Sequence, residues 1–289
     1  MPKAIKRRDT APLQGLKAIK WLLQSPKATA YTGCIGNDVF GRKLSERATS
    51  DGVTVNYMID QDTATGTCAV LITGKDRSLV ANLSAANCYK KEHIIQTSNW
   101  AFVERAQVIY IAGFFLTVST DTILEVGQHC AVKQKTFCMN LSAPFLCEFF
   151  KEQMMEALPY VDILFGNETE AATFSRIHEF KTEDISDIAV KISALPKASS
   201  HCSRTVVITQ GKDPVIVAQD GQINKFPIVP LDSDSILDTN GAGDAFAGGF
   251  LSQLVQGKPI PECVRCGTYA ASIVIQHSGC TFPPTQDYS

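Results

Sequence analysis

A polar turn that contains two glycines leads directly into an apolar helix near the end of the chain, at Asp238-Thr239-Asn240-Gly241-Ala242-Gly243-Asp244-Ala245-Phe246-Ala247-Gly248-Gly249. Gly241 and Gly243 permit a tight turn whose backbone N–H groups stay accessible. The helix that we predict from Ala242 to Val255 directs the positive end of its dipole at the same place. The sequence therefore predicts a site for a phosphate group.

One carboxylate, that of Asp244, falls in the first turn of this predicted helix. A carboxylate beside a bound phosphate is repelled by it, whereas a hydroxyl bound nearby can give up its proton to it. We therefore interpret Asp244 as a general base. For the Gly-Ala-Gly-Asp segment alone, an ordinary helix N-terminus with an acidic first turn is an equally good explanation.

The composition is typical of an α/β enzyme with one large core: 289 residues, of which 45% are hydrophobic, and a formal net charge of −2. No polyanionic partner such as nucleic acid is indicated. Ten cysteines without paired spacing favour a reducing cytosol. The longest apolar run, Val108 to Val118, is too short for a bilayer. We expect a cytoplasmic monomer without membrane contact. A small basic cluster near the start of the chain is either a nuclear import signal or part of a solvated tail; it consists of Lys3, Lys6, Arg7 and Arg8.

Strand-like runs alternate with amphipathic helical segments, which indicates a mainly parallel sheet covered by helices on both faces. The predicted strands are Thr29–Cys34, Gln107–Ala112, Thr136–Asn140, Val161–Phe165 and Thr205–Thr209. The predicted helices are Leu16–Gln24, Asp121–Val132, Pro144–Leu158, Glu168–Arg176 and Thr182–Leu195. A hairpin from Val215–Ala218 to Ile223–Ile228, turning at Asp220-Gly221, is expected at the edge of this sheet.

The piece from Val53 to Asn82 differs, because Gly66–Thr73 and Ser78–Asn82 flank Gly74-Lys75-Asp76 as strands flank a hairpin turn. We interpret residues 53–82 as part of a small β lid. Arg77 lies just beyond the turn, where closure of the lid can bring its guanidinium onto a transferring phosphate. A solvated hairpin arginine is an equally good explanation.

Polar or aromatic residues follow three predicted strands, at the edge where ligands bind in parallel sheets. Asn167 and Glu170 follow Val161–Phe165, where Asn167 is a plausible N-cap and acidic capping of a helix is the ordinary explanation. Gln210 and Gly211 end another strand, where a nucleotide can pass or a plain turn can form. Phe114 follows a third strand, and it either stacks on a base or belongs to the core.

Several stretches together resemble the ribokinase-like carbohydrate and nucleoside kinases, and among these the adenosine kinases. The resemblance extends from about Leu16 to the end of the chain, and it implies a three-layer α/β/α sandwich with a small β lid. The stretches that carry it are Arg77–Leu83, Asn87–Lys91, Ala112–Ser119, Asn140–Phe145 and Asp238–Pro283.

The resemblance implies transfer of the γ-phosphate of ATP to the 5′-hydroxyl of adenosine, with Mg2+ required. Asp244 would deprotonate the hydroxyl, and Arg77 would contact the transferring phosphate. The other implied roles are an anion hole (Gly241, Ala242, Gly243), the adenosine pocket (Leu79, Ala81, Phe114, Asn240), ATP binding (Asn167, Gln210, Gly211) and magnesium (Glu170). Such kinases also commonly bind a monovalent cation, K+, and here it would lie near Ser278-Gly279-Cys280.

The front of the chain departs from this pattern. Adenosine kinases begin with strands that carry a ribose-binding aspartate, followed by a Gly-Gly-x-x-x-Asn element, whereas this chain reads Asp9-Thr10-Ala11-Pro12-Leu13-Gln14-Gly15 there. We therefore expect a divergent tail (residues 1–15) and a kinase domain (residues 16–289) with a partly missing lid, which binds ATP better than adenosine. Two alternatives stay open: a shortened, catalytically silent form that retains nucleotide binding, and a ribokinase-like kinase for another nucleoside or sugar.

Overall fold

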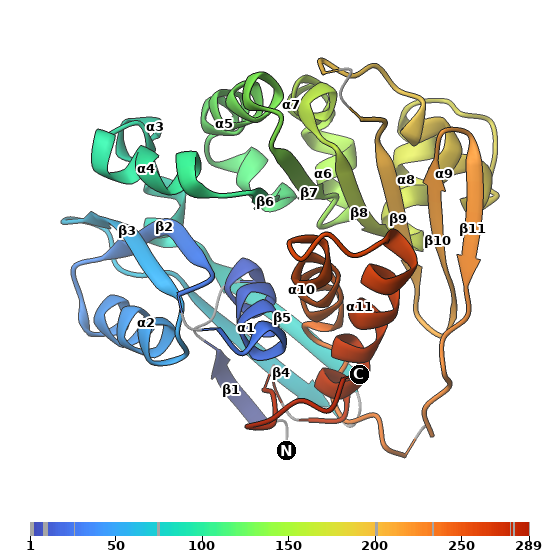
Figure 1. Cartoon of the computed structure of the whole chain (residues 1–289). Coiled ribbons are helices and arrows are strands. Elements are labelled where there is room, and N and C mark those ends of the chain that lie inside the picture. Colours follow the sequence, from blue (N-terminus) through green and yellow to red (C-terminus); the bar gives the residue numbers. More distant parts are fainter. Residues whose placement is uncertain are drawn as a thin grey trace. The chain divides into compact units, whose positions relative to one another are not determined.

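The computed structural model describes residues 3–7, 11–25, 27–73, 76–199, 202–232, 234–277, 279 and 281–288. The chain divides into two compact units, whose elements are labelled in Figure 1. Unit 1 combines Met1–Asn99 with Leu231–Ser289, and unit 2 is Trp100–Pro230. Across the described parts of the chain, no helix combines the length and the apolar character that a membrane crossing requires.

Unit 2 is built on a six-stranded sheet with the strand order β11-β10-β9-β8-β7-β6. The first four strands in the sequence are parallel, and the hairpin β10–β11 is antiparallel at the edge, as predicted. The strands are β6 (Val108–Ala112), β7 (Thr136–Asn140), β8 (Ile163–Asn167), β9 (Thr205–Gln210), β10 (Asp213–Gln219) and β11 (Gln222–Phe226). Asp220 and Gly221, both with positive φ, make the hairpin turn.

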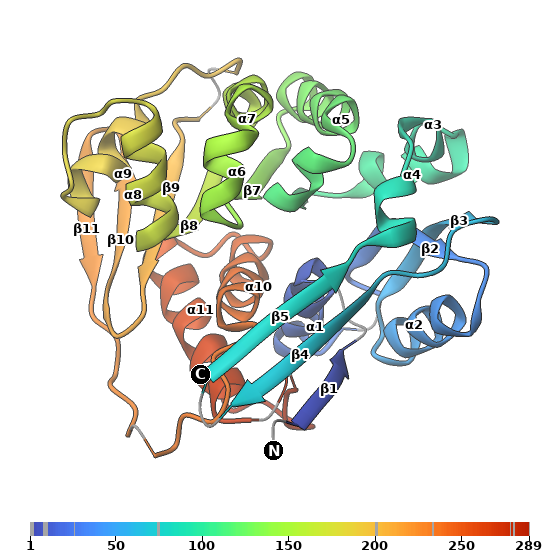
Figure 2. The ribbon, with the colours of Figure 1, turned by 180° about the vertical axis from the view of Figure 1, so that it is seen from behind.

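Helices connect the parallel strands of unit 2. Because β6 to β9 are neighbours in chain order, right-handed crossovers place their helices on one face of the sheet (Figure 2). These helices are α5 (Thr120–Lys133), α6 (Pro144–Phe149), α7 (Lys151–Ala157), α8 (Glu168–Ile177) and α9 (Ile185–Ser193), with 3-10 turns η2 (Gly113–Thr117) and η3 (Leu158–Tyr160). The prediction of one helix over Pro144–Leu158 was wrong, since the backbone of Phe150 leaves the helical region at φ −118° and ψ 29°.

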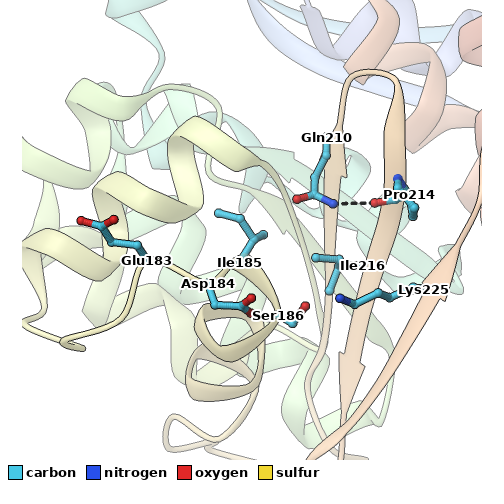
Figure 3. Close-up of a pocket in the computed structure, with 8 residues that line it drawn as sticks. All are labelled: Glu183, Asp184, Ile185, Ser186, Gln210, Pro214, Ile216 and Lys225. Atoms are coloured by element: carbon cyan, nitrogen blue, oxygen red, sulfur yellow. Dashed lines mark hydrogen bonds between the residues drawn. The ribbon is translucent and has the colours of Figure 1, made fainter.

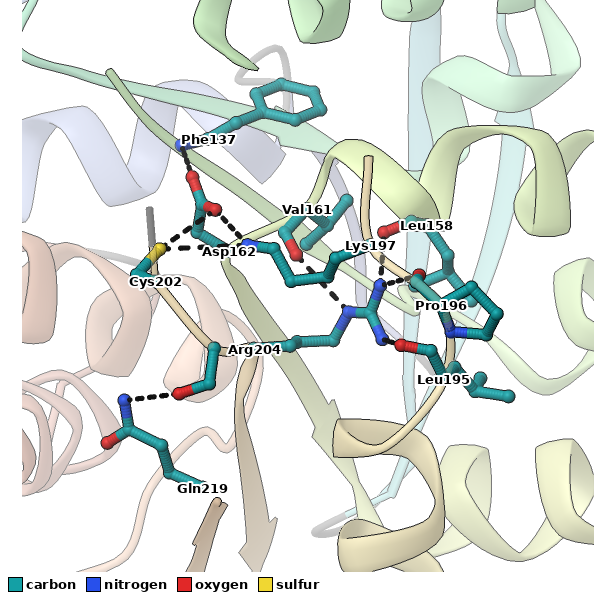
Figure 4. A network of polar contacts seen from close by, with 11 residues as sticks. Phe137, Leu158, Val161, Asp162, Leu195, Pro196, Lys197, Cys202, Arg204 and Gln219 are labelled. Atoms are coloured by element: carbon teal, nitrogen blue, oxygen red, sulfur yellow. Dashed lines mark hydrogen bonds and ion pairs between the residues drawn. The ribbon is translucent and has the colours of Figure 1, made fainter. Parts of the chain in front are cut away.

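A buried arginine joins the starts of β8 and β9 to the loop that follows α9 (Figure 4). The guanidinium of Arg204 is fully buried and donates to five backbone carbonyls, at 2.6–3.2 Å: those of Leu158, Val161, Ile192, Leu195 and Pro196. Burial lowers its pKa to about 10, so it stays charged at neutral pH. Beside it, buried Asp162 accepts from the Phe137 N–H at 2.9 Å and pairs with Lys197. These contacts fix the strand starts, so the polar ends of the same strands are held in register.

Unit 1 contains two small sheets. An antiparallel sheet has the order β1-β4-β5, from Lys3–Arg7, Thr67–Thr73 and Asp76–Asn82, and the predicted hairpin is thus confirmed. The other is a parallel pair, β2 (Ala30–Gly36) and β3 (Thr54–Asp60), connected by α2 (Val39–Ser50). The connecting segments include η1 (Ser84–Cys88), α3 (Lys91–Ile94) and α4 (Thr97–Arg105), and α4 continues into unit 2.

Three expectations for the first 82 residues need correction. The segment Met1–Arg8 is not wholly a tail, because Lys3–Arg7 pairs with the edge of β4, and strand addition needs only backbone N–H and C=O groups. The strand predicted at Thr29–Cys34 pairs with β3 in a sheet of its own, among the described residues, rather than in the main sheet. β3 therefore belongs to a β-α-β unit and not to the hairpin sheet of the predicted lid.

Three helices of unit 1 pack at unusually short range: α1 (Ala11–Leu23), α10 (Ala242–Leu254) and α11 (Ile260–Ile275). A Cβ atom on Gly248 would lie 2.3 Å from the Gly15 carbonyl oxygen and 2.6 Å from the Ala18 Cβ. A Cβ on Gly249 would lie 2.6 Å from the Cys266 carbonyl oxygen. Two successive glycines therefore let α10 touch the backbone of α1 on one side and of α11 on the other.

We predict that Gly248→Ala destabilises the protein by about 1–3 kcal/mol, because the new methyl group meets backbone atoms that cannot rotate away. Urea denaturation followed by circular dichroism measures this. Ala247→Gly, one residue away on the same helix, is the matched backbone control. An unchanged midpoint for Gly248→Ala would show that α1 and α10 are less tightly packed than described.

Candidate active site

The turn before α10 is held by one buried carboxylate. Asp238, 4% exposed, accepts from the Asn240 N–H at 3.0 Å through one oxygen and from the Gly279 N–H at 3.1 Å through the other. Its own N–H donates to the carbonyl of Ile275 at 3.1 Å. The glycine turn is thereby attached to the end of α11. Ser278 and Cys280, the other members of the expected cation turn, lie outside the described residues.

The start of α10 is shaped by a glycine that no other residue replaces easily. Gly241 has φ +81° and ψ 1°, in the left-handed region, and it is the N-cap of the helix. Because glycine has no side chain, no side-chain acceptor caps the N–H groups of the first turn. No described atom lies within 4 Å of a Cβ built on Gly243. The Ala242 N–H donates to the Thr239 carbonyl at 3.3 Å, whereas no side chain caps the turn and the space beside Gly243 is open, so an anion can approach there.

Asp244 lies in this first turn and is half-buried. Burial raises the pKa of its carboxyl from 3.8 to about 7, and no nearby charge contributes. Among the hydrogen bonds and ion pairs of the described residues, none involves this carboxylate. A carboxylate that is desolvated and not paired can take a proton near neutral pH, which is the property of a general base.

Asn240, beside the anion turn, has a buried side-chain nitrogen, Nδ2, that finds no acceptor in the described part of the chain. A buried amide donor without a partner costs free energy, and a bound ligand can supply the acceptor. Arg77 and Leu79 stand in β5, opposite Ile72 and Val70 of β4, and their side chains lie outside the described residues. Ala81, two residues further along the same strand, is exposed.

In unit 2, the carboxyl ends of the parallel strands meet at one edge of the sheet, and β8 ends there in Asn167. Asn167 and Glu170 form a reciprocal capping box at the start of α8. The Glu170 carboxylate accepts from the Asn167 N–H at 3.0 Å and from its Nδ2 at 2.9 Å, while the Glu170 N–H donates back to Oδ1 at 2.8 Å. Capping and a functional role are therefore not alternatives, since the same box fixes both side chains at the strand end.

This geometry defines how the pair could serve a magnesium ion. Glu170 is 6% exposed, burial raises the pKa of its carboxyl, and both its oxygens already accept hydrogen bonds. Such a carboxylate fits a contact to a water ligand of the ion better than direct coordination. No group of three or more His, Cys, Asp or Glu side chains in the described residues is arranged to hold a metal. A hydrated ion with few protein ligands is what this edge can accommodate.

Phe114 follows β6 at the same edge and is 42% exposed. Its ring lies 5.9 Å from that of Phe145, which is 41% exposed at the start of α6. The loop is braced because the Gly113 N–H donates to the Asn140 side chain at 2.8 Å and the Phe114 N–H to the Ser142 hydroxyl at 3.3 Å. Two exposed aromatic rings, one in η2 and one at the start of α6, form a surface on which a planar base can stack.

Gln210 ends β9, and Gly211 follows it with φ +57° and no described atom within 4 Å of a built Cβ. The Gln210 side chain turns back to donate to the Pro214 carbonyl at 2.6 Å, so this N–H group is not available to a nucleotide (Figure 3). It borders a polar pocket of about 340 Å³ lined by Glu183, Asp184, Ile185, Ser186, Gln210, Pro214, Ile216 and Lys225.

Comparison with known proteins shows the family to which the chain belongs. Residues 16–287 match the model of the pfkB family carbohydrate kinases. The chain belongs to this family. Adenosine kinase 1 of Arabidopsis thaliana is 57% identical over 279 residues, which cover 96% of this chain and 81% of that protein. Adenosine kinase of Dictyostelium discoideum is 42% identical, with 93% and 79% covered.

Solved structures give the same result for the fold. Anopheles gambiae adenosine kinase, in complex with P1,P4-di(adenosine-5) tetraphosphate, superposes with a TM-score of 0.92 at 45% identity over 96% of this chain and 82% of that one. Adenosine kinase of Schistosoma mansoni with 2-fluoroadenosine gives 0.91 at 37% identity, with 94% and 80% covered. The predicted ribokinase-like α/β fold with a mainly parallel sheet is confirmed.

The structure adds two residues to which the sequence analysis gave no role. Asp238 is the first residue of the stretch Asp238–Gly249 and was given no role of its own, yet it joins the anion turn to the end of α11. Phe145 was quoted within Asn140–Phe145, and the exposed ring of Phe114 lies against it. Phe145 is the second residue of the helix that begins after the loop following β7, and this place was the available signal, because such loops gather at the same edge.

We predict that Gly243→Ala leaves the free energy of unfolding unchanged or slightly higher, since its φ is not positive and the built Cβ meets no atom. The methyl group would nevertheless enter the space over the N–H groups, and kcat/KM for a phosphate donor should fall by about 10²-fold. Steady-state kinetics and urea denaturation on one preparation separate the two effects. Full activity in Gly243→Ala would place the anion elsewhere.

Proposed function

We propose that the chain transfers the γ-phosphate of ATP to the 5′-hydroxyl of adenosine, giving AMP and ADP. The observation that carries the proposal is Asp244, a carboxylate with a pKa of about 7 in the first turn of a helix that no side chain caps. The family match and the adenosine kinases that share up to 57% of the aligned residues support the choice of substrates.

Asp244 accepts the proton of the 5′-hydroxyl as that oxygen attacks phosphorus. A pKa near the working pH keeps the carboxylate both deprotonated and basic enough to receive this proton. The N–H groups of the turn Gly241, Ala242 and Gly243 stabilise the charge that develops on the transferring group. Arg77 supplies a guanidinium to the same phosphate.

The nucleoside and the nucleotide use different groups. Phe114 and Phe145 stack on the adenine of adenosine, and the unpartnered Asn240 amide donates to the bound substrate. Leu79 and Ala81 add apolar contacts to the nucleoside. For ATP, the backbone at Gln210 and Gly211 borders the nucleotide, and Asn167 binds near its phosphates.

Two cations belong to the proposal. Mg2+ neutralises and orients the phosphates when bound, and Glu170 holds one of its water ligands. K+ binds near the turn that includes Gly279, which Asp238 attaches to the anion turn. We also propose that the enzyme works as a monomer in the cytoplasm and the nucleus, with small molecules as its partners.

We predict that Asp244→Asn lowers kcat by about 10²–10⁴ while the Kd for ATP–Mg2+ stays nearly constant, because only the proton acceptor is removed. Rapid-quench kinetics with adenosine and calorimetric titration of ATP–Mg2+ measure the two quantities. In the parent protein, kcat/KM should rise with pH through about 7, as the carboxyl loses its proton. Turnover of Asp244→Asn at the parent rate would remove Asp244 from the mechanism.

Stability provides the control for that variant. The folded pKa of Asp244, about 7, lies above the value of 3.8 expected in the unfolded chain, so between these values the folded state binds more protons. The contribution of the protonated Asp244 carboxyl to the free energy of unfolding is therefore lost as the pH rises through 7. Asp244→Asn carries no charge and should be more stable than the parent above pH 7, which excludes unfolding as the cause of its lost activity.

We predict that Glu170→Gln raises the Mg2+ concentration needed for half-maximal rate by about 10-fold or more, because the carboxylate that orients a metal-bound water is neutralised. The matched control is Glu168→Gln, which removes the same charge from the same helix turn at an exposed position. Equal magnesium dependence in both variants would leave Glu170 with its capping role alone.

A further inference from the structure

Aromatic side chains join the segment Phe282–Tyr288 to helices α1 and α11 in unit 1. The Trp21 ring of α1, 5% exposed, stacks on Tyr269 of α11 with centroids 5.8 Å apart and on Phe282 at 4.9 Å. The Tyr288 ring packs against that of Tyr269 in a tilted arrangement, with centroids 5.2 Å apart and 44° between the ring planes. Four aromatic rings from three segments thus form one layer.

Polar contacts hold the same segment in place. The Tyr288 hydroxyl donates to the Glu262 carboxylate at the start of α11, and the Tyr269 hydroxyl to Asp287. Arg265 donates to Glu262 at 2.8 Å and lies over the Tyr288 ring, 5.1 Å from its centroid. The segment is therefore fixed to α11 by the rings and hydrogen bonds of Asp287 and Tyr288 at one end, and to Trp21 of α1 by the Phe282 ring at the other.

The aromatic layer extends to Ala245, the residue that follows the proposed general base Asp244. Trp21 and Ala245 belong to one buried cluster with Cys266, Ala270 and Val274, and Phe282 and Tyr288 pack against that cluster. On the same side, a Cβ built on Gly15 of α1 would lie 3.1 Å from the backbone oxygen of Asp244. The position of α1 therefore decides how closely the turn that carries Asp244 is covered.

We propose that the segment Phe282–Tyr288 is a positioning element for Asp244: by clamping Trp21 it holds α1 against the first turn of α10 and keeps water from the carboxylate. The inference deepens the proposed function and rests on it. Phe282 and Tyr288 touch neither substrate nor the reacting atoms, and they act through Trp21 and Ala245.

Burial raises the pKa of Asp244 to about 7, so elements that pack against the turn that carries it can influence that pKa. The charged groups of these elements are engaged elsewhere: Lys17 of α1 pairs with Asp51 at 3.2 Å, Lys20 lies beside Gly52, and Arg265 pairs with Glu262. If the segment is loosened, water reaches the carboxylate and its pKa falls toward 3.8. A weaker base then removes the hydroxyl proton more slowly.

The test is the double variant Phe282→Ala/Tyr288→Ala. We expect the acidic limb of its kcat/KM profile to move down by roughly one pH unit and kcat at the plateau to fall by about 10-fold, with KM for ATP–Mg2+ nearly constant. Thr281→Ala, at an exposed neighbouring position, is the control and should behave like the parent. Activity that falls without movement of the limb would overturn the proposal, because it reports only loss of folded enzyme.

A carboxyl 13C NMR titration of Asp244 in the same variants needs no turnover, so it separates this inference from the proposed function. A lower Asp244 pKa in the double variant supports the inference even if the chain phosphorylates no nucleoside, and an unchanged pKa refutes it. If the double variant does not fold, Phe282→Leu and Tyr288→Phe replace it. Each should shift the pKa in the same direction by a smaller amount, and no shift in either would also refute it.

Discussion

The close approach of α10 to α1 and α11 is the constraint on which the proposed catalytic part of unit 1 depends. Gly248 and Gly249 remove two side chains from the middle of a helix, and backbone atoms of both neighbours fill the space. Glycine in a helix costs about 1 kcal/mol of helix propensity, and the buried apolar contact offsets it. A helix fixed along its middle holds its first turn steady, and that turn carries both the anion-binding N–H groups and Asp244.

In unit 2 the corresponding constraint is the chain order of the parallel strands. Four neighbouring strands in sequence order collect the ends of β6 to β9 at one edge, whatever residues stand there. Arg204 fixes the opposite ends by donating to five carbonyls. The buried guanidinium is tolerated because each of these N–H groups finds a carbonyl, whose partial charge replaces water, and because the nearby carboxylate of Asp162 favours its charged form.

The sequence predicted those elements of the fold that have local signals, and it did not predict the contacts between segments that are distant in the sequence. The parallel strands, both hairpins and the capping segment Asn167–Glu170 are visible as apolar runs, turn residues and caps, which act over a few residues. The strand at Lys3–Arg7 has no such signal, since its partner is more than 60 residues away in β4. Likewise, the interruption of the predicted helix Pro144–Leu158 at Phe150 is not marked in its helical pattern of apolar residues. The contact of Phe114 with Phe145 depends on how two separate loops fold.

The glycines of the signature show why a motif alone cannot assign roles. Gly241 is needed for its backbone angle, Gly243 borders open space, and Gly248 is needed because another helix stands where its side chain would be. All three are glycines within one stretch of 12 residues, yet only the first two border the proposed anion site. Gly15 of α1, whose carbonyl oxygen stands against Gly248, also approaches the backbone oxygen of Asp244. A carboxylate kept out of water destabilises the fold when it is charged, and this cost is the source of its reactivity toward a proton.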